Sequence, residues 1–339
     1  MKSLLSLVLL GLIVACSAVS PPLLAPPRIL ACDDPETEHA AAVSVNHIND
    51  HNLHGYKQVV NRIEKVNVLP RRPHGEIFFL ELDLLETDCH VLSPVPAVNC
   101  TVRERTNHAV KAECDVKLLK DNGIFRVLAA KCHSSLDSAE DVAKPCLGCP
   151  LLSHLNDPEV VKAAHTGLNT FNAKNNTGYT ILEISRGIKR VYPITVHVEF
   201  AIAATNCSAK DVQEHATDCH VLKGDEAQFG FCKATVIQNL PGAVEGAPLE
   251  EISVSCTIFE HEPRKAHAHL AEHHFGKKIP SPGVGHTILD LAHSHNDTHA
   301  SHESHSAEAG VPVGVVKRSV VLGPGPQICP GRIRHFALD

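Results

Sequence analysis

The sequence predicts an α+β protein with two tandem domains, each made of one helix that lies across an antiparallel sheet. Three observations predict this fold. A helix with the same N-terminal signal begins each half of the chain, alternating apolar and polar residues follow it, and four cysteines recur at similar steps in both halves. We expect the domains at residues 27–133 and 144–260, followed by a largely disordered, histidine-rich tail at 261–339.

Residues 1–18 are typical of a secretory signal peptide, with an apolar run at 4–15 and small residues around the expected cleavage site. The alternative is a signal anchor. No later stretch approaches the ~20 apolar residues that a spanning helix needs, so we expect a secreted, extracellular protein without a membrane span. The formal net charge of -7 argues against a nucleic-acid partner, because phosphate binding needs a basic surface.

The helix signal is an Asp-Pro-Glu tripeptide, found at 34–36 and again at 157–159. Asp can accept hydrogen bonds from free backbone N–H groups, Pro has its φ set for the first turn, and Glu lies near the positive end of the helix dipole. Apolar residues at helical spacing then predict one buried face in each helix. These residues are Ala41, Val45 and Ile48 in the first helix and Ala164, Leu168 and Phe171 in the second.

After each helix the hydrophobic period changes to two, which predicts strands at 77–84 and 194–200. Further β-rich runs surround 123–130, 229–237 and 252–259. One helix followed by several strands indicates a sheet with one face under the helix and the other face in water.

The hexapeptide TDCHVL occurs at 87–92 and at 217–222, but the cysteines reject the register that it suggests. Aligning the two copies leaves Cys132 without a counterpart. A shift by one cysteine gives steps of 11, 14 and 18 against 12, 13 and 24. In this frame Cys89, Cys100, Cys114 and Cys132 correspond to Cys207, Cys219, Cys232 and Cys256.

Twelve cysteines remain once the signal peptide is removed, an even number for an oxidising compartment. Cys146 and Cys149 form a CxxC motif that could be a redox pair or half of a metal site, but a structural disulfide is favoured in a secreted chain without a second CxxC. Equivalent modules should carry equivalent bridges. We therefore expect Cys89–Cys100, Cys114–Cys132, Cys207–Cys219, Cys232–Cys256, Cys146–Cys149 and, from the remaining two, Cys32–Cys329.

Four sequons agree with secretion. We favour glycosylation at Asn175 and Asn296 over Asn99 and Asn206, because the last two sequons contain a cysteine that we expect to be bridged. The dibasic pair Lys317-Arg318 is either a processing site or a plain surface pair.

Four segments closely resemble the fetuin branch of the cystatin superfamily: 32–38, 85–92, 231–235 and 329–336. The resemblance implies two cystatin-like domains in a secreted plasma glycoprotein that binds calcium phosphate and restrains ectopic calcification. The family is also linked to inhibition of insulin-receptor tyrosine kinase signalling. We expect a monomer that requires no cofactor, with calcium phosphate as its partner.

The family's candidate mineral site is an acidic face on the first sheet. The matching residues are Glu76, Glu81, Asp83, Glu86 and Asp88. Alternation places Glu81 and Asp83 on one strand face, where carboxylates ~7 Å apart could ligate Ca²⁺. The sequence has Phe79 where the family pattern would extend the row with an acid.

Protease inhibition is the alternative function, with a metalloprotease favoured over a cysteine protease. The inhibitory QxVxG hairpin of cystatins resembles the segment 58–62, but Arg62 replaces the glycine and the chain contains no Trp. In relatives that inhibit zinc metalloproteases the linker resembles CPDCP. Here Gly148 stands at the aspartate, so it offers no side-chain ligand to zinc.

The tail holds eleven histidines between 261 and 305, which could bind Zn²⁺ or Cu²⁺ weakly or form part of a solvated spacer. The candidate ligands are His267, His269, His273, His274, His293, His295, His299, His302 and His305. We expect no enzymatic activity, because we find no nucleophile motif, no pair of histidine ligands at i and i+4 on a helix and no phosphate loop.

Overall fold

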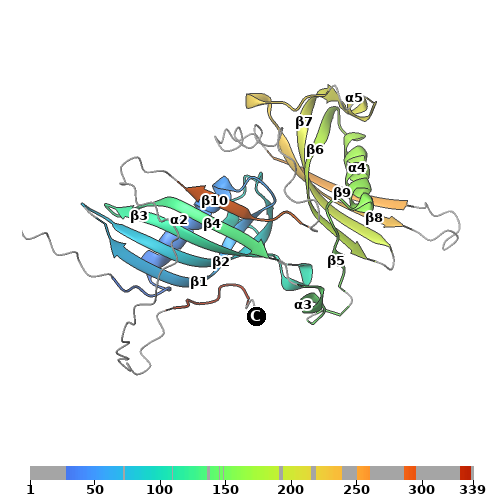
Figure 1. Ribbon diagram of the computed structural model, residues 1–339. Coiled ribbons are helices and arrows are strands. Elements are labelled where there is room, and N and C mark those ends of the chain that lie inside the picture. The colour runs from blue at the N-terminus through green and yellow to red at the C-terminus, as the bar shows by residue number, and fades with distance from the viewer. Residues whose placement is uncertain are drawn as a thin grey trace, which may run out of the picture.

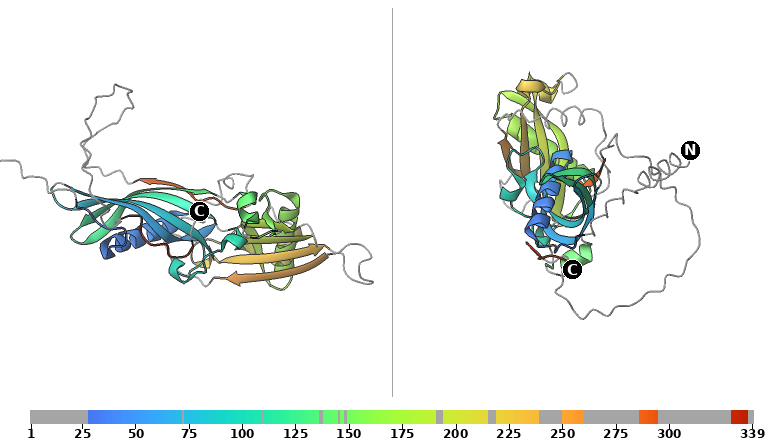
Figure 2. Two further views of the ribbon diagram at one scale, coloured as in Figure 1. Left: turned by 90° about the horizontal axis from the view of Figure 1, so that it is seen from below. Right: turned by 90° about the vertical axis from the view of Figure 1, so that its left-hand side faces the viewer.

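The computed structural model describes residues 28–71, 73–108, 110–135, 138–144, 146–147, 149–190, 194–214, 219–238, 250–259, 286–294 and 329–336. They form two five-stranded sheets, each crossed by one long helix (Figure 1). Figure 2 shows that the two domains lie end to end, which gives an elongated molecule. The α+β architecture expected from the sequence is confirmed.

The first domain begins with helix α2 (Pro35–His51), followed by β1 (Tyr56–Pro70), β2 (Glu76–His90), β3 (Lys111–Asp121) and β4 (Ile124–Ser135). Two short 3₁₀ turns, η1 (Ala97–Asn99) and η2 (Arg105–Asn107), lie between β2 and β3. The sheet order is β1-β2-β3-β4-β10, and all neighbours are antiparallel. Alternate residues of β2 face α2, so Leu80, Leu82 and Leu84 are buried in the core.

The second domain repeats this plan. It contains β5 (Leu151–Leu152), α4 (Pro158–Asn172), β6 (Thr177–Arg190), β7 (Thr195–Ser208), β8 (Phe229–Gln238) and β9 (Glu250–Ile258), in sheet order β5-β6-β7-β8-β9. The shorter elements are α5 (Ala209–Glu214) and η4 (Gly224–Glu226), and α3 (Ala139–Ala143) lies in the linker between the domains.

Both long helices begin at the expected cap. The Asp34 carboxylate accepts a hydrogen bond from the Glu36 N–H at 2.8 Å, and the Asp157 carboxylate accepts one from the Glu159 N–H at 2.9 Å. These bonds satisfy N–H groups that the first helical turn leaves open. The expected buried faces are also present, although Phe171 is only partly buried.

Part of the predicted tail belongs to the first domain, contrary to the boundary expected from sequence. Strand β10 (Asp290–Ser294) pairs antiparallel with β4, and Leu289 is 4% exposed within the core. Leu289 donates its N–H to Ser134 Oγ at 2.9 Å and accepts the Ser134 N–H at 2.9 Å. Two leucines two residues apart are too short a pattern to predict a strand in a histidine-rich segment.

The C-terminal segment 329–336 covers the opposite edge of the same sheet. Gly331 and Arg334 donate backbone N–H groups to the carbonyls of Ile63 and Asn61 on β1, at 2.8 and 2.9 Å. The Asn61 side chain also donates to the Phe336 carbonyl at 2.9 Å. Free backbone groups of an edge strand are thereby satisfied.

Six disulfides join the pairs that the cysteine spacing suggested. They are Cys32–Cys329, Cys89–Cys100, Cys114–Cys132, Cys146–Cys149, Cys207–Cys219 and Cys232–Cys256. Cys89, in the first TDCHVL segment, lies on β2 and corresponds to Cys207 at the equivalent end of β7. Cys219, in the second TDCHVL segment, corresponds instead to Cys100, since each is the disulfide partner of the strand cysteine. The two TDCHVL segments therefore occupy different places in their domains.

The domains meet through an apolar cluster and a buried charge network. Tyr56, Val91 and Leu92 of the first domain pack with Ala201, Ala203, Phe229 and Phe231 of the second. Beside them the Glu183 carboxylate accepts hydrogen bonds from His54 Nδ1 at 2.8 Å and His90 Nε2 at 2.7 Å. Burial alone would raise the pKa of Glu183, but these hydrogen bonds and the imidazole charges hold it well below its usual value.

None of the helices in the described part of the chain has the length and apolar character that a bilayer crossing requires.

Candidate cation-binding face

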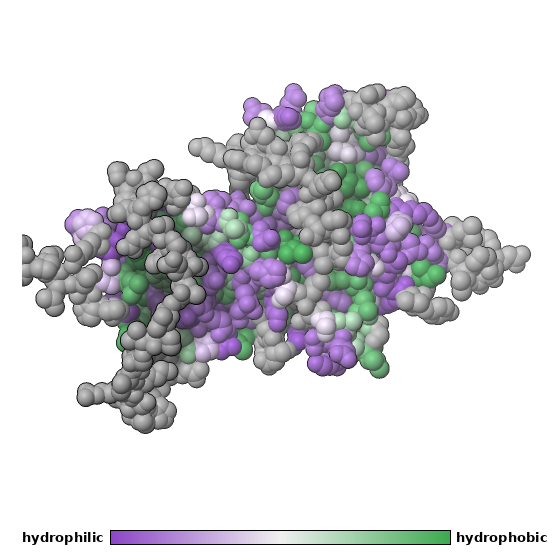
Figure 3. Space-filling model, viewed as in Figure 1, coloured by the Kyte–Doolittle hydropathy of each residue, from purple (hydrophilic) through white to green (hydrophobic). Residues whose placement is uncertain are grey.

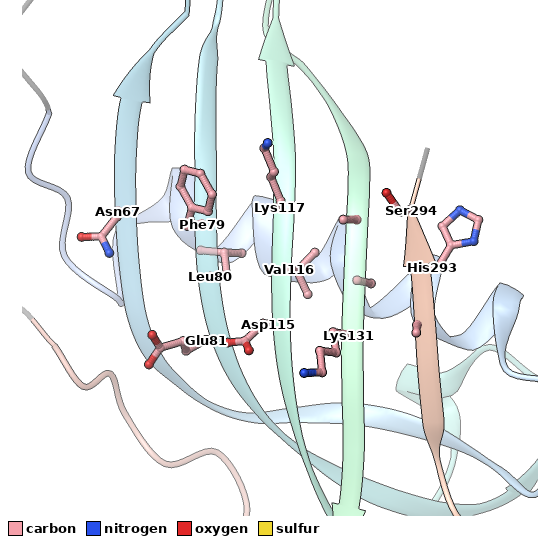
Figure 4. Close-up of a pocket in the computed structure, with 13 residues that line it drawn as sticks. Asn67, Phe79, Leu80, Glu81, Asp115, Val116, Lys117, Lys131, His293 and Ser294 are labelled. Carbon is pink, nitrogen blue, oxygen red and sulfur yellow. The ribbon is translucent and has the colours of Figure 1, made fainter. Parts of the chain in front are cut away.

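The outer face of the first sheet is the side turned away from α2, and it carries a group of carboxylates. On β2, Glu81 and Asp83 point outward between the buried leucines, as alternation predicted. The Glu81 side chain is 48% exposed. In Figure 4, α2 passes behind the strands, and Glu81, Asp115 and Lys131 lie in one row across β2, β3 and β4.

Three further acids, none of them among the predicted site residues, join this face from neighbouring strands. Glu113 lies opposite Asp83, Asp115 lies opposite Glu81, and Glu64 comes from β1. The signal was present, because Glu113 and Asp115 alternate with buried Ala112, Cys114 and Val116. Directly opposed residues have Cβ atoms about 4.5–5.5 Å apart, so the array extends across the strands rather than along one strand.

The five carboxylates line one hollow of about 580 Å³, together with Lys131 and His133. We call this group, Glu64, Glu81, Asp83, Glu113 and Asp115, the acidic face. Like charges directly opposite each other on a sheet are destabilising. A divalent cation bound between them would remove that repulsion, and calcium accepts several carboxylate oxygens at once.

The crowding of these negative charges changes the pKa of Asp83. Partial burial and the neighbouring Glu64, which shares a hydrogen bond with it, raise the pKa of Asp83 to about 6. Below that pKa the two carboxyl groups share a proton, at a place that a cation could take.

Basic residues neutralise part of the negative charge of the acidic face. Lys65 forms an ion pair with Glu81 at 2.7 Å, and Arg62 forms one with Glu64 at 3.0 Å. The row ends at Phe79, which is 38% exposed and has the Lys117 ammonium 5.8 Å from its ring centre. Hydrophilic side chains nevertheless cover most of the visible described surface of this domain (Figure 3).

The sequence prediction was wrong for Glu86. Its side chain is 2% exposed and forms ion pairs with Arg103, at 2.8 Å, and with Arg186 of the second domain. Strict alternation would have excluded it, because residue 86 has the parity of the inward-facing leucines. A carboxylate buried between two guanidinium groups is not available to a mineral surface.

Glu76 and Asp88 also lie apart from the acidic face. Glu76 forms an ion pair with Arg28 at 3.0 Å, near the start of α2. Asp88 lies near the end of β2 and accepts a hydrogen bond at 3.1 Å from the N–H of Thr101, which belongs to the following loop. Of the five predicted residues, the structure places only Glu81 and Asp83 on the outer face.

Among the predicted histidine ligands only His293 lies within the described residues, and it lies beside His47 and His51 of α2. The expectation that no helix carries histidines at i and i+4 was wrong. The other predicted ligands, His267, His269, His273, His274, His295, His299, His302 and His305, lie outside the described residues, as do Asn296, Lys317, Arg318 and residues 1–18.

The three remaining sequons can be located. Asn99 and Asn206 are exposed, whereas Asn175 is half-buried and its Nδ2 donates to the Phe171 carbonyl at 2.7 Å. Exposure therefore does not favour Asn175 over the other two. Occupancy at all four sites stays a prediction.

The segments that matter for protease inhibition differ from an inhibitory cystatin. Residues 58–62 lie inside the long strand β1, where no hairpin is formed. The linker carries the Cys146–Cys149 disulfide, and Leu147 between these cysteines is 94% exposed.

Comparison with known proteins places this architecture in a family. Residues 148–240 match the model of the cystatin domain. The chain is 42% identical over 343 residues to alpha-2-HS-glycoprotein of Rattus norvegicus, and the match covers 92% of each chain. The chain belongs to the alpha-2-HS-glycoprotein, or fetuin, family. The resemblance indicated by the sequence motifs is confirmed.

Other known proteins are similar to this chain over most of their length. Antihemorrhagic factor cHLP-B of Gloydius brevicauda is 46% identical, with 87% of this chain and 85% of that protein covered. A chain in the inhibitory complex of human meprin beta with mouse fetuin-B has a TM-score of 0.60 and 26% identity, with 70% of this chain and 76% of that chain covered.

The two copies of the fetuin module use the outer sheet face differently. In the first domain Asp83 faces Glu113 across β2 and β3, and at the same register in the second domain Ala201 faces Phe231 across β7 and β8. Ala201 and Phe231 belong to the apolar cluster that packs against the first domain. Only the first domain therefore carries a charged pair at this position.

Proposed function

We propose that this chain is a secreted plasma glycoprotein that binds calcium phosphate through its acidic face and so inhibits ectopic calcification. The observation that carries the proposal is the set of five carboxylates around one hollow on a sheet face. Membership of the fetuin family supports it. Six disulfides and the signal-like residues 1–18 support secretion.

Calcium phosphate presents calcium ions at a surface, and a sheet face is suited to meet a surface. Each carboxylate can contribute oxygens to a different calcium, since outward residues two apart on a strand are ~7 Å apart and opposed residues are ~5 Å apart. Calcium tolerates irregular oxygen ligands, so the array need not form a closed cage. Inhibition of insulin-receptor signalling stays a prediction from the family resemblance.

The experiment adds purified protein to supersaturated calcium phosphate and follows turbidity. We expect the wild type to delay precipitation and the Glu81→Gln/Asp83→Asn variant to delay it less. Adding Glu113→Gln and Asp115→Asn should weaken the delay further. A matched control, Glu250→Gln/Glu251→Gln, removes the same charge from β9 of the second domain and should behave like the wild type.

The outcomes separate function from site. A wild type that delays nothing would reject calcium phosphate binding. If the four-residue variant matches the wild type while the wild type is active, the function stands and the acidic face is the wrong site.

A second candidate function, inhibition of a zinc metalloprotease, is favoured by the linker. Mouse fetuin-B is found in an inhibitory complex with human meprin beta. Here a disulfide holds the exposed Leu147 in a short loop between the domains, where it could enter an apolar protease subsite. We expect Leu147→Ser to weaken any inhibition of meprin-type proteases. If no such protease is inhibited by excess wild type, this candidate is rejected.

A further inference from the structure

We propose that His47, His51 and His293 form a binding site for one divalent transition-metal ion, with zinc or copper(II) as the expected occupant. One possible ligand nitrogen from each ring lies within 4.8 Å of the others. The site joins α2 to β10, which places the returning segment of the chain against the helix. It is separate from the acidic face in its residues and in its chemistry.

The helix supplies two of the ligands by its geometry. Residues four apart lie on the same helical face, and the rings of His47 and His51 stack with centroids 3.9 Å apart. His293 completes the group, with its ring centroid 4.9 Å from that of His47 and 4.3 Å from that of His51. All three side chains are partly buried, so a bound ion would remain accessible from solvent.

The register of β10 fixes His293 in this position. Leu289 is anchored in the core, and Leu291, two residues further, also packs against it. Alternation therefore directs His293 toward α2 as well, while Ala130 of β4 lies opposite it in the sheet. Figure 4 shows His293 on β10, at the edge of the sheet, and α2 passing behind the strands.

One ring is already held in the form that binds metal. His51 Nδ1 lies 2.8 Å from the His47 carbonyl oxygen, which can only accept a hydrogen bond. Nδ1 of the neutral ring must therefore carry the proton, and the lone pair is left on Nε2. Metal-binding histidines commonly donate the second ring nitrogen to a backbone carbonyl in this way.

The ligand set selects the class of metal. Three neutral imidazoles suit zinc, copper and nickel, whereas calcium and magnesium prefer oxygen. Ligand nitrogens about 2.0–2.1 Å from a tetrahedral zinc are roughly 3.3 Å from each other, so small side-chain rotations would close the group. Three protein ligands leave the fourth position to water.

The test uses the full-length protein and must separate this site from the other tail histidines. We would titrate cobalt(II), read by visible absorbance, and zinc, read by calorimetry, into the wild type and into His51→Gln and His293→Gln. Either substitution should weaken the affinity for the most tightly bound metal ion at least roughly tenfold. Even the loss of a residue that only hydrogen-bonds a metal ligand has an effect of that size. His39→Gln, on the same helix and outside the group, should leave it unchanged.

A second measurement asks where the metal binds. Zinc should slow amide hydrogen exchange at 290–294 in the wild type, because the ion ties β10 to α2. It should not do so in His51→Gln. A tight equivalent that survives in both substituted proteins overturns the proposal, and so does exchange at 290–294 that zinc leaves unchanged in the wild type.

Discussion

Arg186 of β6 forms an ion pair with Glu86 of β2, and the two side chains are 1% and 2% exposed. The pair crosses from one domain to the other. Arg103 also contacts Glu86, and its guanidinium reaches Glu199 of the second domain at 2.5 Å. Charges removed from water in this way are stable only while each keeps its partner.

Replacing Arg186 with Met should therefore destabilise the protein by about 2–4 kcal/mol. This range is lower than for a fully unpaired buried charge because Arg103 remains beside Glu86. The measurement is the urea midpoint of unfolding. The double variant Arg186→Met/Glu86→Met should recover part of the loss, since apolar groups can replace a buried pair. Lys65→Met breaks the exposed pair with Glu81 and should change stability by less than about 1 kcal/mol. Equal effects from Arg186→Met and Lys65→Met would contradict this account.

Calcium binding at the acidic face should depend on pH through Asp83. The pKa of Asp83 is raised to about 6, so calcium must displace a proton from it near that pH. Affinity should rise between pH 5 and 7, and the rise should be smaller in Asp83→Asn. Calorimetry in two buffers with different ionisation enthalpies measures the proton released. No release at pH 6 would rule out Asp83 as a ligand.

The same raised pKa affects stability in a defined direction. The folded protein holds the Asp83 proton more tightly than the unfolded chain, whose pKa is near 3.8. Ionisation of Asp83 therefore opposes folding. The stability that protonated Asp83 contributes is fully present below about pH 4 and is lost as pH rises through about 6. The stability of Asp83→Asn relative to the wild type should be higher at pH 8 than at pH 4, as measured by thermal unfolding at both pH values. A difference that is the same at both pH values would contradict the assignment.

Leu289 tests whether the returning segment is part of the first core. Leu289→Ala removes a side chain that is 4% exposed, so we expect a loss of about 2–3 kcal/mol. Asp290→Ala, one residue further and exposed, should have little effect. Chemical unfolding compares them. A neutral Leu289→Ala would show that 286–294 does not contribute to the fold.

Gly167 in α4 marks a close approach between helix and sheet. A Cβ there would lie 2.7 Å from the Ala234 Cβ and 3.4 Å from Phe200. Alanine is favoured over glycine in a helix by about 1 kcal/mol, but overpacking costs about 1–3 kcal/mol. We expect Gly167→Ala to lower the thermal midpoint. A raised midpoint would mean that the helix can shift freely from the sheet.

Local signals in the sequence predicted the elements that local chemistry determines. The Asp-Pro-Glu caps predicted both helices, and alternation predicted the inward leucines of β2. β1, β3 and β6 were missed as strands, and all three contain register shifts that break the period of two. β10 could not be predicted, because its pairing with β4 depends on a contact between distant parts of the chain.

The candidate site was predicted in part for the same reason. Glu81 and Asp83 follow from one strand, whereas Glu113 and Asp115 join them only through the pairing of β2 with β3. Alternation alone could have excluded Glu86, whereas its pairing with Arg186, which lies 100 residues away in the other domain, could not be predicted. The helical pair His47 and His51 was overlooked although its spacing is present in the sequence, and its proximity to His293 depends on the path of the tail.

The divergence of the two outer sheet faces determines valency. In the second domain that face is apolar at Ala201 and Phe231 and is used up in the contact between the domains, so each molecule offers one acidic face rather than two. On the proposed function, such a molecule covers a growing particle with its bound side, and neither described sheet presents a second acidic face on its other side. A monovalent coat of this kind keeps particles apart, whereas a molecule with two acidic faces would crosslink them into aggregates.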